Sequence, residues 1–380
     1  MFTARSLAQG DGYVDPAGAP TARAPLGWPA ILSVFYLLSG PNVLSAQIFS
    51  AVVASATCVV TFLLGARLFD TRVGLGAGLI LALFPVHILW SAVLLTEVMF
   101  AFVLAFILFV ASGNVLGWRA FVLGLMVGAA TLIRTEALLL PTLIFALLLA
   151  RGLSWRVTCR LVAFVVCGMA VFVVPWAARN TLAFDAPVFL TTRTGVSFFV
   201  GRGTGDLNPY YDLASGYRDL PEPERSLEID RAAMRRAVDD FMSNPLADLG
   251  RTPAKLRRLY AYDPVWTAYG RLLIEPSWSG PPSFGQARVI AEAYYWFVLA
   301  GALLAVALRP SSSSRSGYTL LFGTVGLWSF MFGVLFFGDA RYHLALLPVL
   351  SILAASGYTA LLERVGPGTK LSDPSPEPRR

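Results

Sequence analysis

The chain has 380 residues, of which 56% are hydrophobic and only 14% carry a charge. A soluble domain carries about 25% charged residues, so this deficit predicts that lipid forms part of the solvent around the chain. The formal net charge of +7 is then a signal of membrane orientation, and no nucleic-acid partner is expected. The three cysteines show no metal or redox spacing and are interpreted as small core residues.

Residues 1–44 are predicted to form an extracytoplasmic loop. Residues 1–13 are polar and lack the apolar core of a signal peptide. The apolar stretch 25–39 is too short, and too closely bracketed by prolines, to cross a bilayer. Its composition instead favours a helix that lies in the membrane interface.

From residue 45 onward, apolar runs approach about 20 residues, the length that crosses about 30 Å of hydrocarbon. They predict an all-α polytopic membrane protein with about eight or nine transmembrane helices, in two groups at 45–178 and 289–362. Residues 179–288, of mixed polarity with a charged helical middle at 221–242, are predicted to be an extracytoplasmic loop domain, and 363–380 a disordered cytoplasmic tail. The candidate spans are 45–66, 73–90, 96–112, 119–133, 136–150, 161–178, 289–308, 318–337 and 342–362.

The arginines of the short loops decide the orientation, because cytoplasmic loops carry an excess of basic residues. With residues 1–44 outside, the short outer turns hold only Arg134 and Arg341. The inner loops hold Arg67, Arg72, Arg119, Arg151, Arg156, Arg160, Arg309, Arg315 and Arg364. This one-sided distribution supports a topology in which residues 1–44 lie outside the cytoplasm.

Ionisable side chains near the membrane segments fall on one side of this topology. Such residues are costly beside lipid and are by default functional candidates. They all lie at outer helix ends, where the large loop also opens, so the sequence predicts a polar site at the extracytoplasmic face. The residues are His87, Glu97, Arg134, Glu136, Arg179, Asp339, Arg341 and His343.

Glu97 and His87 each have a structural explanation beside the functional one. Glu97 can act as a general base or bind a cation, but a carboxylate in the first turn of a helix is also stabilised by the helix dipole. From spacing alone the structural explanation is preferred. His87 lies outside any metal-binding spacing, and a lone histidine at a helix end is more often a hydrogen-bonded core residue than a ligand.

The outer arginines have two explanations as well. Arg134 with Glu136 is interpreted as a neutralised pair that lets the chain turn at the membrane surface, slightly ahead of substrate contact. Arg179 fits either a snorkelling cation or a phosphate ligand. Arg341 is a basic residue in an outer turn, contrary to the orientation rule. A structural pair with Asp339 or an anionic ligand would explain its position.

Two motifs of the large loop carry less weight. The glycine-rich run GRGTG at 201–205 follows no clear strand and fits neither nucleotide-binding fingerprint, so a surface turn is preferred. The basic run RTPAKLRRLY at 251–260 predicts an amphipathic helix that lies on lipid headgroups.

Four stretches, in this order, resemble the GT-C superfamily of integral-membrane glycosyltransferases. The branch is that of the bacterial relatives of protein O-mannosyltransferases and lipid A aminoarabinose transferases. The stretches are ARSLAQGDGYVDPAGAPTARAPLGWPAIL, FPVHILWSAVLLTEVMF, PWAARNTLAF and GDARYHLALLPVL. The resemblance covers most of the chain, and the order of the motifs is fairly specific for the superfamily but not for a substrate.

The resemblance implies a GT-C-like helical bundle in a bacterial plasma membrane. It implies transfer of a hexosyl or pentosyl group from a polyprenyl-phosphate-linked donor to a lipid, glycan or protein acceptor on the extracytoplasmic face. No cofactor is assigned, and a divalent metal ion is left open. The implied site residues are Glu97 as the catalytic residue, Arg179, Arg341, Arg134, Tyr342 and His343 on the lipid phosphate, and His87 in support.

One departure from the superfamily pattern concerns the N-terminus. In the superfamily, a membrane helix precedes the ARSLAQGDGY-like stretch and ends in an acidic motif that contains the expected base. This chain begins at Met1, just downstream, so the sequence predicts that the first helix and this acid are missing. A misplaced start is preferred over a truncated gene or a partner's contribution, and without that segment the chain is expected to be inactive.

Two other functions stay open at this point. One is a non-catalytic membrane subunit that binds a lipid-linked sugar for a partner. The other is a transporter or flippase, which the prolines that interrupt apolar runs, Pro85, Pro141 and Pro348, keep open.

Overall fold

The computed structural model describes residues 2–202, 208–262, 283–308 and 315–365. Over these residues the chain is helical, and its single strand-like pairing is a bridge between Val14 and Pro20. The all-α prediction is confirmed for this part of the chain. Met1, residues 203–205 of the glycine-rich run and the predicted tail from 366 onward lie outside the described residues.

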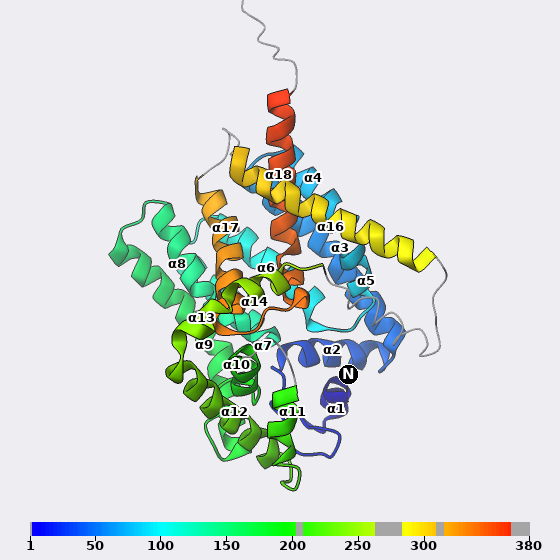
Figure 1. Ribbon diagram of the computed structural model, residues 1–380, viewed down its shortest axis with the longest axis vertical. Coiled ribbons are helices and arrows are strands. Elements are labelled where there is room, and N and C mark those ends of the chain that lie inside the picture. Colours follow the sequence, from blue (N-terminus) through cyan, green and yellow to red (C-terminus); the bar gives the residue numbers. More distant parts are fainter. Residues whose placement is uncertain (1, 203–207, 263–282, 309–314, 366–380) are drawn as a thin grey trace, which may run out of the picture.

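The helices divide into four groups along the chain (Figure 1). Helices α1 and α2 precede the first membrane group, α3 to α9, and the region α10 to α14 separates it from the second membrane group, α16 to α18. The elements are α1 (Phe2–Gln9), α2 (Gly27–Ser39), α3 (Val43–Leu68), α4 (Thr71–Ala82), α5 (Pro85–Ser91), α6 (Thr96–Ser112), α7 (Trp118–Ile133), η1 (Thr135–Leu139), α8 (Leu140–Ala150), α9 (Trp155–Phe184), α10 (Thr194–Arg202), α11 (Asn208–Ser215), α12 (Glu224–Ser243), α13 (Pro245–Gly250), α14 (Thr252–Leu259), α16 (Ser283–Leu308), α17 (Arg315–Phe330), η2 (Met331–Leu335), η3 (Ala340–Leu346) and α18 (Leu347–Val365).

Every predicted span is mostly helical in the structure. By length and composition, five helical segments of the described chain can cross a membrane, and the bent pair α4–α5 makes a sixth if it counts as one span. The apolar helices α2, α6, α7 and η1–α8 are shorter. The structure therefore confirms a polytopic membrane protein, and the count of eight or nine spans stays a prediction.

The run predicted as one span at 73–90 is two helices that meet at an angle of 59°. Pro85 opens α5, and Phe84 before it is extended. Proline has no backbone N–H to donate and disfavours helical geometry in the residue before it, so the helix ends before this point.

Small residues set the closest helix contacts of the bundle. Gly124 and Gly128 of α7 lie directly against the backbone of α9, and Gly168 of α9 lies against the backbone of α7. A Cβ atom at any of these positions would meet backbone atoms of the other helix. Small residues at such crossings let membrane helices approach closely, so this pair packs backbone to backbone.

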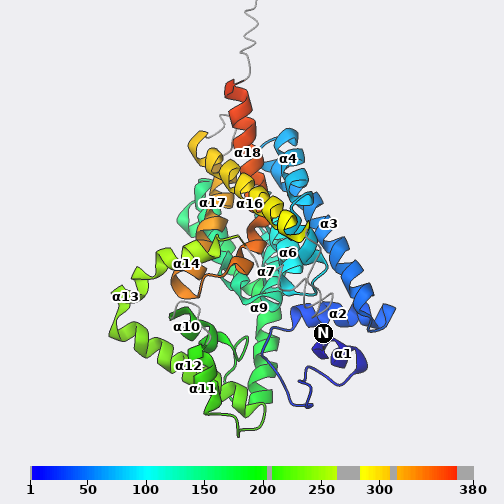
Figure 2. The ribbon, with the colours of Figure 1, turned by 45° about the vertical axis from the view of Figure 1, so that its right-hand side comes forward.

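The predicted outer segments gather at one end of the molecule. In both ribbon views α1, α11 and α12 lie at the end opposite the free end of α18 (Figures 1 and 2). Helix α2 matches the short helix predicted at 25–39, and α12 matches the charged helix predicted at 221–242. This arrangement fits the predicted topology, and which end faces the cytoplasm stays a prediction.

Candidate active site

Glu97 is the centre of a buried ion cluster at the start of α6. Its residue is 2% exposed. Its Oε1 atom accepts a hydrogen bond from Nη1 of Arg134 at 2.8 Å and a second one from Nε of Arg341. Its Oε2 atom accepts a hydrogen bond from the Thr96 hydroxyl at 3.2 Å. Two cations from distant parts of the chain therefore meet on one carboxylate.

Arg134 bridges two carboxylates. Its backbone is extended between α7 and η1. Its Nη2 and Nε atoms donate to Oε1 of Glu136 at 2.6 and 3.1 Å. Its guanidinium lies over the rings of Tyr342 and Phe100, at 5.4 and 5.9 Å from their centroids. The Arg134–Glu136 pair expected from the sequence is present, and it is one part of a larger cluster.

Arg341 makes a contact that the sequence did not suggest. The expected pair with Asp339 is not between side chains, because the Asp339 carboxylate instead accepts the backbone N–H of Arg341 at 2.9 Å and caps η3. The Arg341 guanidinium is directed to Glu97, 244 residues away in sequence. Its side chain is 34% exposed, against 11% for Arg134, so Arg341 forms the open edge of the cluster.

The charges of the cluster balance. Arg134 and Arg341 offset Glu97 and Glu136, which reduces the cost of burying them. Only Nε of Arg341 is engaged, and its two terminal nitrogens form no hydrogen bond or ion pair with a described residue. The arrangement therefore presents a fixed cation with free donors at the edge of a neutral, buried group.

Tyr342 and His343 follow Arg341 in η3. The Tyr342 ring stacks on Phe332, with centroids 4.4 Å apart, and its face packs against the Arg134 guanidinium. His343 is buried, with Nδ1 at 2.8 Å from the Leu259 carbonyl oxygen and its ring 5.1 Å from that of Tyr295. Tyr342 thus belongs to the cluster, whereas His343 joins η3 to the end of α14.

The remaining predicted site residues lie elsewhere. Arg179 donates to the carbonyl oxygens of Thr21 at 2.9 Å and Tyr13 at 2.8 Å, so it fastens the N-terminal segment to α9. The buried His87 ring lies 3.1 Å from the Ala54 carbonyl oxygen, between α5 and α3. Neither residue contacts the Glu97 cluster.

A second buried ion cluster was not foreseen. Arg202 pairs with Asp248 and donates to the Leu335 carbonyl oxygen at 2.9 Å, which ties α10 to the end of η2. Lys255 lies 3.9 Å from Asp248, and its burial lowers the pKa of its ammonium group. Arg202 is the arginine of the glycine-rich run and Lys255 is in the basic run, so both motifs supply structural contacts.

A cavity of about 450 Å³ lies beside the Glu97 cluster, between η1 and the loop region. Glu136 lines it from η1, and Thr194, Ser197 and Asp230 line it from α10 and α12. Burial raises the pKa of the Asp230 carboxyl, which accepts the backbone N–H of Val196 at 3.0 Å. The volume is in the range of small-molecule sites.

No metal site emerges from the part of the chain that the structure describes. Within it, no group of three or more His, Cys, Asp or Glu side chains is placed to hold a metal ion. The divalent ion that the sequence left open therefore has no assigned ligands.

Comparison with known proteins finds one matching family and several solved structures of similar fold. Residues 23–178 match the dolichyl-phosphate-mannose-protein mannosyltransferase family, and no curated protein matches the sequence. The structure is similar to the oligosaccharyltransferase AglB of Archaeoglobus fulgidus in complex with an inhibitory peptide and a dolichol-phosphate, at 14% identity and a TM-score of 0.53, over 97% of this chain and 48% of that chain.

Two further solved structures are similar. The Archaeoglobus fulgidus oligosaccharyltransferase in complex with Zn and sulfate matches at 14% identity and a TM-score of 0.52, over 90% of this chain and 41% of that chain. ArnT from Cupriavidus metallidurans bound to undecaprenyl phosphate matches at 16% identity and a TM-score of 0.44, over 94% of this chain and 72% of that chain.

The chain thus shares its fold with the archaeal oligosaccharyltransferase, a membrane glycosyltransferase of the GT-C type, and residues 23–178 match the mannosyltransferase family. The resemblance drawn from the four sequence stretches is confirmed at this level. The chain spans about half the length of the archaeal oligosaccharyltransferase that it resembles.

Proposed function

We propose that the protein transfers a sugar, with inversion at the sugar carbon, from a polyprenyl-phosphate-linked donor. The acceptor is a lipid, glycan or protein on the extracytoplasmic face of a bacterial plasma membrane. The observation that carries this proposal is the Glu97 cluster, in which Arg341 holds free donors at the edge of a buried ionic group. The dolichol-phosphate held by the archaeal structure supports a lipid-phosphate donor.

Arg341 is proposed to stabilise the departing lipid phosphate. As the bond between sugar and phosphate breaks, negative charge grows on the phosphate oxygens. A guanidinium that is already oriented stabilises this charge without reorganising, and its planar fork matches two phosphate oxygens. Because Glu97 engages only Nε, no residue that the structure describes occupies the two terminal nitrogens, and both can make such a contact.

Glu97 is proposed to position Arg341 and Arg134. Two guanidinium groups hold its carboxylate in the charged form, and its residue is almost fully buried. An acceptor hydroxyl would have to displace an arginine to reach Oε1. The geometry therefore favours an orienting role over the role of a base that the sequence left open.

The test measures consumption of lipid-linked sugar in membranes that contain the wild-type protein, Arg341→Ala or Arg341→Lys. We expect Arg341→Ala to lower turnover by about 10²–10³-fold, the loss typical of removing one preorganised donor. Arg341→Lys keeps the charge but lacks the fork, so it should recover only part of this loss. The matched control is Arg151→Ala, at the other end of the bundle.

Wild-type turnover in both Arg341 variants would overturn the assignment of this residue. If the wild-type protein binds a lipid-linked sugar but never consumes it, the non-catalytic subunit would replace the enzyme as the best function. Folding of each variant is checked by its elution in size-exclusion chromatography.

A further inference from the structure

The segment from η2 to η3 carries Arg341 and connects α17 to α18. Its first part, η2, is a single π-helical turn, in which the Phe336 N–H donates to the Met331 carbonyl oxygen at 2.7 Å. Such turns are rare and occur frequently at functional sites. The backbone is extended at Phe336 and again at Asp339, directly before η3. This irregular backbone needs partners from other elements to satisfy its polar groups and to hold one conformation.

Arg202, the last residue of α10, supplies one of these partners. Its Nη2 atom donates to the Leu335 carbonyl oxygen at 2.9 Å and to that of Val334 at 3.4 Å. Carbonyl groups in the last turn of a helix have no N–H partner within that helix. The Arg202 guanidinium therefore caps the end of η2, although the two elements are more than 130 residues apart in sequence.

Asp248 fixes the direction in which Arg202 points. Its carboxylate pairs with Nη1 of Arg202, and both residues are buried, with 3% and 7% of their surface exposed. Arg251 donates to the Arg202 carbonyl oxygen and lies 3.8 Å from Asp248. A buried ion pair is weak evidence for stability, because desolvation offsets the attraction between its charges. A role in holding one geometry explains this pair better.

Two glycines let the loop region, α10 to α14, touch the backbone of the same segment. A Cβ atom on Gly201 of α10 would lie 2.9 Å from the Phe336 carbonyl carbon. A Cβ atom on Gly338 would overlap the carbonyl oxygen of Lys255 in α14. Any larger residue at these positions must displace backbone, so α10 and α14 both lie in direct contact with the segment.

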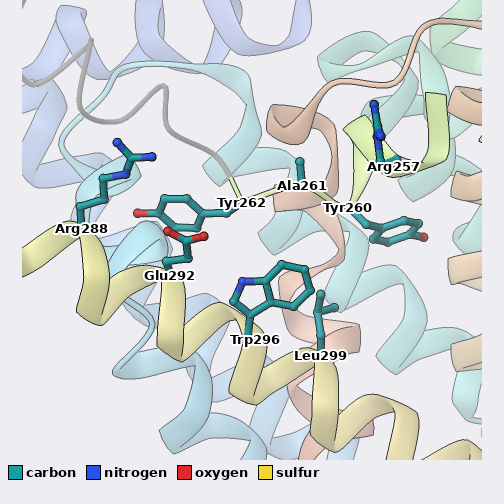
Figure 3. A pocket seen from close by; sticks show the side chains of 8 residues that line it. All are labelled: Arg257, Tyr260, Ala261, Tyr262, Arg288, Glu292, Trp296 and Leu299. Carbon is teal, nitrogen blue, oxygen red and sulfur yellow. The ribbon is translucent and has the colours of Figure 1, made fainter. Parts of the chain in front are cut away.

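The end of α14 is itself held between α16 and η3. In Figure 3, Tyr260 follows α14 and faces a cavity whose other wall is α16. The Tyr295 hydroxyl of α16 donates to the Tyr260 carbonyl oxygen at 2.8 Å. The His343 ring of η3 lies 2.8 Å from the Leu259 carbonyl oxygen. Helix α14 therefore connects a membrane helix to the element that carries Arg341.

We propose that Arg202 is a positioning residue for Arg341. With Asp248 it fixes the end of η2. Helix α14 contacts the backbone at Gly338 and the ring of His343, on the two sides of Arg341. A cation stabilises developing charge best if it is already in place, and a misplacement of about 1 Å can lower a rate about 10²-fold. The inference rests on the proposed function, in which Arg341 stabilises the departing phosphate.

The first test is a double-mutant cycle in the lipid-linked sugar assay. Arg202→Gln should lower turnover by about 10- to 100-fold in the wild-type background. In the Arg341→Ala background the same change should cause no further loss, because the group that Arg202 positions is absent. A merely structural role would lower turnover by the same factor in both backgrounds, and that result would overturn the proposal.

The second test needs no substrate. Hydrogen–deuterium exchange of the purified full chain, followed by mass spectrometry, measures how firmly residues 336–346 are held. We expect these residues to exchange faster in Arg202→Gln and in Gly338→Ala, whose methyl group would displace α14. The matched control is Gly74→Ala, whose methyl group would lie 2.6 Å from the Phe62 carbonyl oxygen, at the contact of α4 with α3.

The outcomes separate this proposal from the proposed function. Faster exchange in Arg202→Gln and Gly338→Ala, with unchanged exchange in Gly74→Ala, supports the positioning role. Unchanged exchange in the first two variants, or equal acceleration in all three, overturns it. Gly338→Ala serves for both tests if Arg202→Gln does not fold. If the wild-type protein consumes no lipid-linked sugar but the exchange result holds, the proposed function alone is contradicted.

Discussion

The two ends of the helical bundle use arginine in different ways. At the end predicted to face the cytoplasm, Arg151 donates to the carbonyl oxygens of Ser112 and Gly113 at 2.7 and 2.8 Å, and Arg364 donates to that of Leu308 at 2.7 Å. At the opposite end, Arg134 and Arg341 bind buried carboxylates. The first kind of contact satisfies carbonyl groups at helix ends, which have no partner within the helix.

The difference separates structural cations from candidate functional ones. A cation on a helix-end carbonyl lies near water and costs little. A buried group of four charges is expensive to assemble, and replacement by apolar residues is often neutral or stabilising. The Glu97 cluster at one end of the bundle is therefore better explained by the proposed catalytic chemistry than by a contribution to the stability of the fold. Arg179, at the same end as the Glu97 cluster, makes carbonyl contacts like those of the first kind, and its role as a phosphate ligand stays a prediction.

The largest expected effect tests the buried side of this comparison. Arg134→Ala leaves Glu136 without its arginine and Glu97 with Arg341 alone. Breaking a buried ion pair by removing one partner costs about 3–5 kcal/mol, so the variant should unfold at a clearly lower temperature and lose turnover. The measurement is thermal unfolding in detergent, followed by tryptophan fluorescence, together with the transfer assay.

A smaller effect is expected at the other end. Arg151→Ala removes two charged hydrogen bonds to carbonyl oxygens, but the side chain is only half-buried and water can replace it. We expect a loss of about 1 kcal/mol and unchanged turnover. If Arg151→Ala unfolds as early as Arg134→Ala, or loses turnover, the distinction between the two ends fails.

The smallest effect concerns Asp230, a half-buried carboxylate of α12 that forms no ion pair with a described residue. Burial raises the pKa of Asp230 above its ordinary value, so the folded state binds this proton more tightly than the unfolded state. Its stabilising contribution is present below the unfolded pKa of about 3.9 and is lost as pH rises through the folded value.

Asp230→Asn should remove this dependence. Relative to the variant, the wild-type protein should lose unfolding temperature as the pH rises above about 4, the pKa of the unfolded group. Asp239→Asn, at an exposed position of the same helix, is the control and should change little. A wild-type protein that gains stability over Asp230→Asn with rising pH would contradict the sign of the shift.

Local sequence was sufficient for the helices and for one ion pair. Each apolar run became helical because a continuous run of apolar side chains has its backbone satisfied in lipid only by hydrogen bonds within the helix. Arg134 and Glu136 are two residues apart, so their contact could also be expected. The break at Pro85 has a local cause and was visible as a proline, although the sequence was interpreted as one span.

The partners of the other charged groups were decided by the tertiary structure. Sequence identified Glu97 and Arg341 as candidates, but their contact joins residues 244 positions apart. It also treated Arg179 and Arg341 as equivalent phosphate ligands, whereas folding commits the first to backbone carbonyl oxygens and leaves the second with free donors. Hydropathy is a sum over neighbours in the chain, while a charge is neutralised by whichever group lies closest in space.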